Sequence, residues 1–115
     1  MVLARMADDP EWCASALALT EVHITLCHAG LASSGLSTAT AALRRDWDHF
    51  IVVPVDDLCL ARSRDIGCAQ RIRTLDAIHL AAAERIPAPA LFLTFDTRQH
   101  AAATNMGFDV VGVAA

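Results

Sequence analysis

The stretch "RTLDAIHLAAAERI", residues 73–86, decides the fold class of this chain. Its apolar residues recur at helical spacing, Thr74 suits the capping position before a helix, and Pro87 ends the segment. A helix that is apolar on several sides must be buried between other elements. Asp76 in its first turn should therefore sit where the core meets the edge of a sheet.

Short apolar strands alternate with helices on both sides of this segment. Such alternation predicts an α/β fold in which helices flank a parallel sheet, a three-layer sandwich built as one domain over residues 1–115. Asp56 or Asp57 starts one helix, Ser37 or Thr38 caps another, and Gly30 and Gly107 close two more. The predicted strands are 12–16, 50–55, 91–95 and 109–113, and the predicted helices are 2–8, 17–30, 37–47, 56–67, 75–86 and 97–106.

Composition excludes several classes of protein. Hydrophobic residues make up 55% of the chain, yet charged or polar residues interrupt every run before the roughly 18–20 residues that a membrane helix needs. The start of the chain shows no basic and then apolar signal region, so we expect a cytoplasmic protein without a membrane segment. The four cysteines form no CxxC pair and should be reduced.

The charge balance limits the ways in which this chain can bind nucleic acid. A net charge of −4 argues against a simple electrostatic nucleic-acid binder, although a bound cation would reverse the local sign. All nine basic residues are arginine. The absence of lysine excludes a P-loop, and it also argues against a phosphorylation receiver domain, which the strand "FIVVPVDD" otherwise resembles.

Three carboxylates interrupt apolar stretches. Asp96 follows the strand 91–95, at the end where parallel α/β sheets bind ligands, although it also suits an N-cap in a capping box with Gln99. Asp76 would gain from the dipole of its own helix. Glu21 lies on an apolar helix stripe, where it must be paired, for example with Arg85, or face solvent.

Taken together, the three acids indicate a metal site. Clustered carboxylates repel one another unless a cation lies between them, and hard oxygen ligands suit Mg²⁺ or Mn²⁺. We therefore predict that Glu21, Asp76 and Asp96 converge as metal ligands and catalytic groups, with a metal-activated water attacking a phosphodiester.

Other candidate sites are weaker. His23 and Cys27 have a spacing found in zinc sites, but no second pair completes one. His79 lies one turn after Asp76 and is a candidate to orient it. Ser15 lacks the glycine pattern of a nucleophile elbow.

The segments "RTLDAIHLAAA" and "LFLTFDTRQHAAATNMGFDVV" resemble the second half of a PIN-domain ribonuclease toxin of the VapC type, and "ASALALTEV" resembles an earlier motif of that family. The resemblance implies that Glu21, Asp76 and Asp96 match the family's second, third and fourth acids. It further implies a toxin of a type II toxin–antitoxin system, with Mg²⁺-dependent endoribonuclease activity on RNA, homodimer formation and neutralisation by a cognate antitoxin.

The sequence departs from this family at its start. The family begins with a strand that ends in an Asp-x-Ser/Thr motif, and neither that strand nor its acid has a counterpart here; Asp8 and Asp9 follow no apolar strand. We therefore expect the strands 12–16 and 91–95 to flank an open slot in the sheet, and metal binding to be weaker than in a version extended upstream. The alternative function is a non-catalytic PIN-like module that binds an antitoxin or another partner.

Overall fold

Helix α5 (Thr74–Ala83) forms the centre of the core in the computed structural model, which describes residues 2–9, 11–87 and 90–112 and, within helix α1, omits the side chains of residues 2 and 3. Six of its ten residues are buried, and Leu80 is fully so. The apolar stretch identified in the sequence is thus the buried helix that its pattern predicts.

Helix α4 (Asp57–Gln70) packs against α5 through small side chains. A Cβ added at Gly67 would lie 3.5 Å from the Cβ of Ala77, so the two backbones approach closely there. Asp56 caps α4 by accepting a hydrogen bond from the Cys59 N–H, as predicted. The helix continues past Gly67, the predicted end, and stops where Arg71 adopts a left-handed conformation, with φ of 54°.

The strands pair in two separate sheets. Strand β1 (Trp12–Ser15) pairs in parallel with β2 (Phe50–Val53), and β3 (Leu91–Thr94) pairs in parallel with β4 (Asp109–Gly112). A side chain at Gly112 would collide with the backbone of Thr94, so this pairing requires glycine there.

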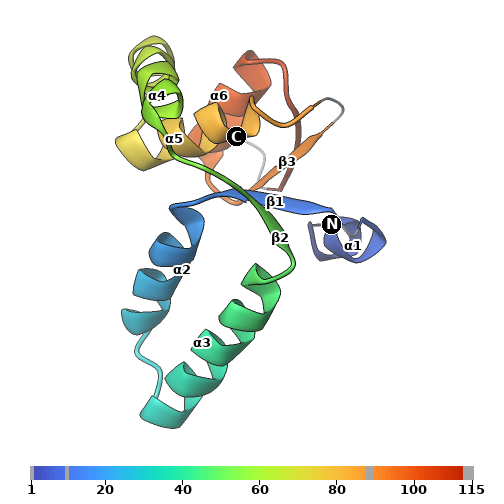
Figure 1. Cartoon of the computed structure of the whole chain (residues 1–115), viewed down its shortest axis with the longest axis vertical. Helices are drawn as coiled ribbons and strands as arrows, with labels where there is room; N and C mark the ends of the chain where they lie inside the picture. The colour runs from blue at the N-terminus through green and yellow to red at the C-terminus, as the bar shows by residue number, and fades with distance from the viewer. Residues whose placement is uncertain (1, 10, 88–89, 113–115) are drawn as a thin grey trace.

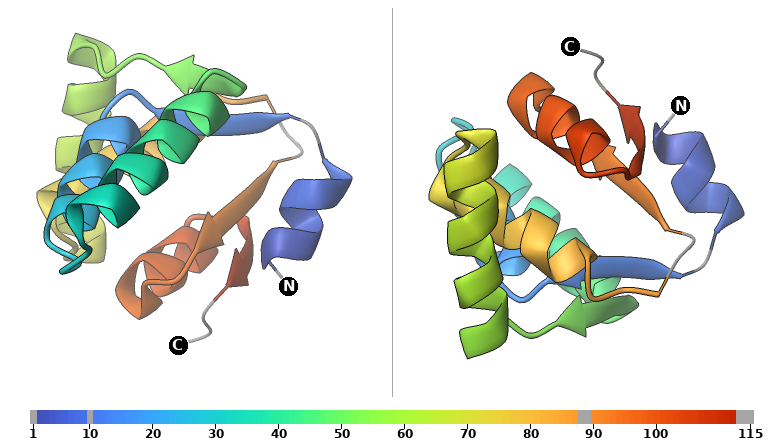
Figure 2. Two further views of the ribbon diagram at one scale, coloured as in Figure 1. Left: turned by 90° about the horizontal axis from the view of Figure 1, so that it is seen from below. Right: turned by 90° about the horizontal axis from the view of Figure 1, so that it is seen from above.

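The α/β class with parallel strands and flanking helices is confirmed, but within the described residues the strands do not join into one sheet. Figures 1 and 2 show β1 and β3 running at an angle to each other. An open groove lies between them, lined by residues of both strands. This geometry corresponds to the slot expected between residues 12–16 and 91–95.

Several element bounds differ from the prediction. Helix α2 (Ala18–Cys27) ends before Gly30, which lies in the following loop. Helix α3 (Ser33–Trp47) starts before the predicted caps, directly after Ala32 in extended conformation. Thr74 is the first residue of α5 and not its cap, because Arg73 takes that position, and α5 ends at Ala83 in a short turn.

The remaining elements agree with the prediction more closely. Helix α1 (Val2–Asp8) has the predicted bounds. Helix α6 (Thr97–Asn105) ends in two hydrogen bonds, from the Gly107 and Phe108 N–H groups to carbonyls of the last turn, with Gly107 at φ of 93°. Val113, the predicted end of the last strand, lies outside the described residues.

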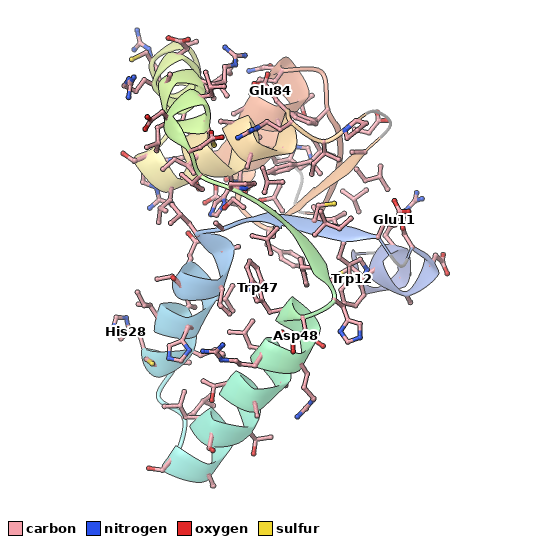
Figure 3. The ribbon with its side chains drawn as sticks, in the orientation of Figure 1. Glu11, Trp12, His28, Trp47, Asp48 and Glu84 are labelled. Atoms are coloured by element: carbon pink, nitrogen blue, oxygen red, sulfur yellow. The ribbon has the colours of Figure 1, made fainter. Side chains whose placement is uncertain are left out.

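Helices α2 and α3 form a hairpin that extends away from the body of the protein (Figure 1). Neither helix has a fully buried residue, and Val22, Ile24 and Leu31 are exposed. Aromatic packing joins the hairpin to the first sheet: the ring centroid of Phe50 lies 5.6 Å from that of Trp47 and 5.5 Å from that of Trp12. Figure 3 labels the two tryptophans, Trp47 at the end of α3 and Trp12 on β1.

No helix in residues 2–9, 11–87 and 90–112 is both long enough and apolar enough to cross a membrane.

Candidate metal and nucleic-acid site

Asp76 is a buried carboxylate in the first turn of α5. The residue is 9% exposed, and its Oδ2 atom is buried with no hydrogen-bond partner. Arg73 forms an ion pair with this carboxylate, with its Nε 3.5 Å from Oδ2, but makes no hydrogen bond to that atom. A buried acceptor without a hydrogen bond costs free energy, so this atom is suited to a ligand that the protein itself does not supply.

Asp96 follows β3 and caps α6. Its Oδ1 accepts hydrogen bonds from the N–H groups of Arg98 and Gln99, at 2.8 and 3.1 Å. The bond from the Gln99 N–H is the main cause that lowers the pKa of Asp96, and the positive charge of Arg73 adds to it. The Gln99 side chain does not complete a capping box, because it accepts a hydrogen bond from Thr94 instead. Capping thus uses one oxygen of Asp96 and leaves Oδ2 for a cation.

Arg73 brings the two aspartates together. One nitrogen of its guanidinium lies 3.5 Å from Oδ2 of Asp76, and another lies 3.5 Å from Oδ2 of Asp96. The distance to Asp96 ends on the oxygen that its capping hydrogen bonds leave free, and the distance to Asp76 ends on its buried oxygen without a hydrogen bond. Arg73 was not singled out as a site residue from the sequence. Its position three residues before Asp76 at a helix start is the signal that such an ion pair forms.

Glu21 belongs to a different group of side chains. Its Oε1 lies 3.0 Å from Nε2 of His79, and Nδ1 of the same ring lies 2.7 Å from the hydroxyl of Ser15. His79 thus contacts Glu21 and Ser15, whereas from the sequence it was considered as a candidate to orient Asp76. The predicted alternative partner of Glu21, Arg85, pairs with Asp56 at 2.8 Å.

The structure therefore brings Asp76 and Asp96 together and keeps Glu21 apart from them. Within the described ranges, no three residues of the His, Cys, Asp and Glu types form a group that could hold a metal ion. Two carboxylates can suffice for Mg²⁺, which often keeps several water ligands. The hard oxygen donors of Asp76 and Asp96, one of them buried and without a hydrogen bond, fit such an ion.

A groove and a shallow depression open to the surface at these two groups of side chains. The groove between β1 and β3 is lined by Ser15, Glu21 and His79. A second, open depression contains Asp96 together with Arg73, Phe95, Thr97 and Arg98.

A comparison with protein families identifies a match to the PIN domain over residues 2–105. No curated protein and no solved structure matched the sequence. PIN domains are in general nucleases that act on nucleic acids, typically with divalent metal ions. The match spans nearly the whole chain, and the parallel strands and flanking helices agree with it. This protein is a member of the PIN-domain family.

Proposed function

We propose that this protein is a Mg²⁺-dependent endoribonuclease that acts as the toxin of a type II toxin–antitoxin system. The observation that carries the proposal is the pair formed by Asp76 and Asp96 beside the end of β3, with a buried carboxylate oxygen that makes no hydrogen bond. In a PIN domain, such a pair is the natural place for a divalent cation.

In this proposal, Asp76 and Asp96 would hold the ion, and Mn²⁺ could replace Mg²⁺. When bound, the ion would supply an activated water as nucleophile and would neutralise charge on the phosphodiester. The backbone N–H groups that bind Oδ1 of Asp96 fix the direction of its second oxygen. Arg73 gives up its place between the carboxylates and becomes available to a phosphate.

Glu21 is the proposed third acid of the site. It reaches the aspartates only after leaving His79, which now holds it at 3.0 Å. Because His79 is three residues after Asp76 on α5, the two side chains lie on neighbouring turns of one helix face. The movement required of Glu21 is therefore local to this face.

The toxin role adds a cognate antitoxin, a homodimer and a cytoplasmic location to the proposal. The resemblance of the acidic motifs to VapC-type toxins supports it. Apolar side chains exposed on and beside the α2–α3 hairpin, Val22, Ile24 and Leu31, are consistent with a surface that another protein covers.

The second candidate function is a non-catalytic PIN-like module that binds an antitoxin or another partner. The separation of Glu21 from the aspartates favours it, since no three-residue metal group forms in the part of the chain that the structure describes.

RNA cleavage tests the proposal. A circular RNA substrate, which only an endonuclease can open, is incubated with the protein in Mg²⁺ or in EDTA. We expect linear product in Mg²⁺ only, and loss of product in Asp76→Ala and in Asp96→Asn, since asparagine preserves capping. Asp57→Ala, which removes an exposed acid from the first turn of α4, is the matched control. Cleavage that survives both site variants refutes the assignment of the acids, and absence of cleavage by the wild type with Mg²⁺ favours the non-catalytic module.

A further inference from the structure

Phe95 is a large aromatic side chain in an unusual position. It lies between the last residue of β3 and Asp96, and it is 72% exposed. Phe92 on the same strand packs against Phe108, with ring centroids 5.7 Å apart. The core thus uses one phenylalanine of this segment and leaves the other in solvent, directly beside the aspartate pair.

Two arginines accompany Phe95 in the same open depression. Arg73 and Arg98 line it together with Phe95, Asp96 and Thr97. Both arginines are exposed, and the guanidinium of Arg73 lies 3.5 Å from the carboxylates of Asp76 and Asp96. The depression therefore combines the apolar ring of Phe95 with two guanidinium groups and the side chain of Thr97.

We propose that this depression is the binding surface for single-stranded RNA, with one base stacked on Phe95 and the adjoining phosphates held by Arg73 and Arg98. The proposal rests on the proposed function, because it names the substrate that the aspartate pair would cleave. Exposed aromatics interleaved with cations are the elements with which proteins bind single strands. A base inside a duplex presents no free face for stacking, so a double strand would not use Phe95.

The charges of the depression predict how binding responds to a divalent ion. Without metal, the positive charges of Arg73 and Arg98 are balanced by Asp76 and Asp96, so stacking on Phe95 contributes most of the affinity. A divalent cation on the aspartates would make the surface positive and free Arg73 for phosphate. The net charge of −4 thus does not oppose this surface, because the local balance differs from that of the whole chain.

The test is the affinity of the whole protein for a fluorescently labelled single-stranded oligoribonucleotide, measured by anisotropy in EDTA so that no cleavage occurs. Phe95→Ala and Phe95→Leu should each weaken binding by about 5- to 20-fold, since leucine is apolar but cannot stack. Phe95→Trp should preserve binding. The exposure of Phe95 makes these variants harmless to the fold.

Matched controls come from α4. Leu58 is 76% exposed, so Leu58→Ala removes an equally exposed apolar side chain away from the site and should not change affinity. Arg98→Gln should reduce the slope of log affinity against log salt by about 0.7, the value for one phosphate contact on a single strand. Arg64→Gln, an exposed arginine of α4, should leave that slope unchanged.

Equal affinities of wild type and Phe95→Ala, or equal affinities of single strand and duplex, would overturn the proposal. It would also be overturned if Phe95→Ala changed the molar mass in light scattering and not the RNA affinity, since Phe95 would then belong to a protein interface. If the protein binds RNA but does not cleave it in Mg²⁺, the proposed nuclease activity is refuted and the proposed RNA-binding surface is retained. If the protein cleaves RNA and Phe95→Ala binds RNA as tightly as wild type does, the proposed binding surface is refuted and the proposed nuclease activity is retained.

Discussion

Replacing Asp76 with alanine should stabilise the metal-free protein. Most substitutions of buried residues destabilise a fold, by about 1 kcal/mol on average. Asp76 is different because its Oδ2 is buried without a hydrogen bond, and the nearest cation, Arg73, is itself 72% exposed and lies 3.5 Å away. The variant removes the acceptor and, among the residues that the structure describes, leaves no other buried side-chain nitrogen or oxygen without a partner.

The magnitude follows from three contributions. Removing an unsatisfied buried acceptor increases the free energy of unfolding by about 1–3 kcal/mol. Losing an acid from the first turn of a helix costs about 0.3–1 kcal/mol. Losing the pairing with an exposed arginine costs about 0–1 kcal/mol. The free energy of unfolding should therefore rise by about 1 kcal/mol in EDTA, which raises the melting temperature by about 3–6 °C for a domain of this size.

In Mg²⁺, the order of stability of wild type and Asp76→Ala should be reversed. A ligand at 100 times its dissociation constant stabilises the protein that binds it by about 2.7 kcal/mol. Wild type should gain this stabilisation and Asp76→Ala should not, so that wild type becomes the more stable protein. Urea unfolding followed by circular dichroism, in EDTA and in Mg²⁺, measures both differences.

The control is Asp57→Ala, because Asp57 is an exposed acid in the first turn of α4. It loses only the helix-dipole contribution and should be destabilised by about 0.3–1 kcal/mol with or without metal. A lower stability of Asp76→Ala than of wild type in EDTA would show that Oδ2 is satisfied in solution. Equal stabilisation of both proteins by Mg²⁺ would refute the assignment of Asp76 to the proposed metal site.

Three further predictions concern neighbouring groups. His79→Ala should lower the free energy of unfolding by about 1–3 kcal/mol in urea titrations, because buried Ser15 and partly exposed Glu21 lose a shared partner; unchanged stability would contradict the observed contacts. The pKa of Asp56 is lowered, first by the Cys59 N–H and then by Arg85, so its stabilising contribution is complete above the ordinary value of 3.8 and is lost as pH falls through the lowered value. Asp56→Asn should consequently show a smaller loss of melting temperature between pH 6 and pH 3 than wild type, and an identical pH profile would refute this. Leu80→Ala should cost about 2–5 kcal/mol, measured by thermal unfolding, since the side chain is completely buried.

The sequence predicted the elements of the fold better than their assembly. Apolar periodicity located all of the helices and strands that the structure describes, because periodicity reflects which faces are buried. It placed helix starts less well, as at α3, where Ala32 precedes the helix although Ser37 and Thr38 are better capping residues. Periodicity carries no information on which strand edges meet, so the division into two sheets was not derivable from the pattern of any one strand.

The candidate site shows the same limit at the level of side chains. Asp76 and Asp96 were identifiable because each follows a local rule, a first-turn acid and a strand-end cap, and both rules hold in the structure. Glu21 was identifiable as an acid in need of a partner, but its partner was not. His79 is distant from it in sequence, and a long-range contact of this kind depends on how β1 and α5 pack.

The position of His79 explains how Glu21 and the two aspartates can lie in separate groups and still be connected to one helix. Asp76 and His79 are three residues apart on α5, so both are held by the same buried helix, whose core residues fix its rotation. Glu21 is tied to this helix through His79, and Asp96 is tied to it through Arg73. Each outer acid therefore reaches α5 through a nitrogen contact, from the ring of His79 or from the guanidinium of Arg73. In the proposed function, a divalent ion would replace these two contacts, and α5, which carries both Asp76 and His79, would position the acids around it.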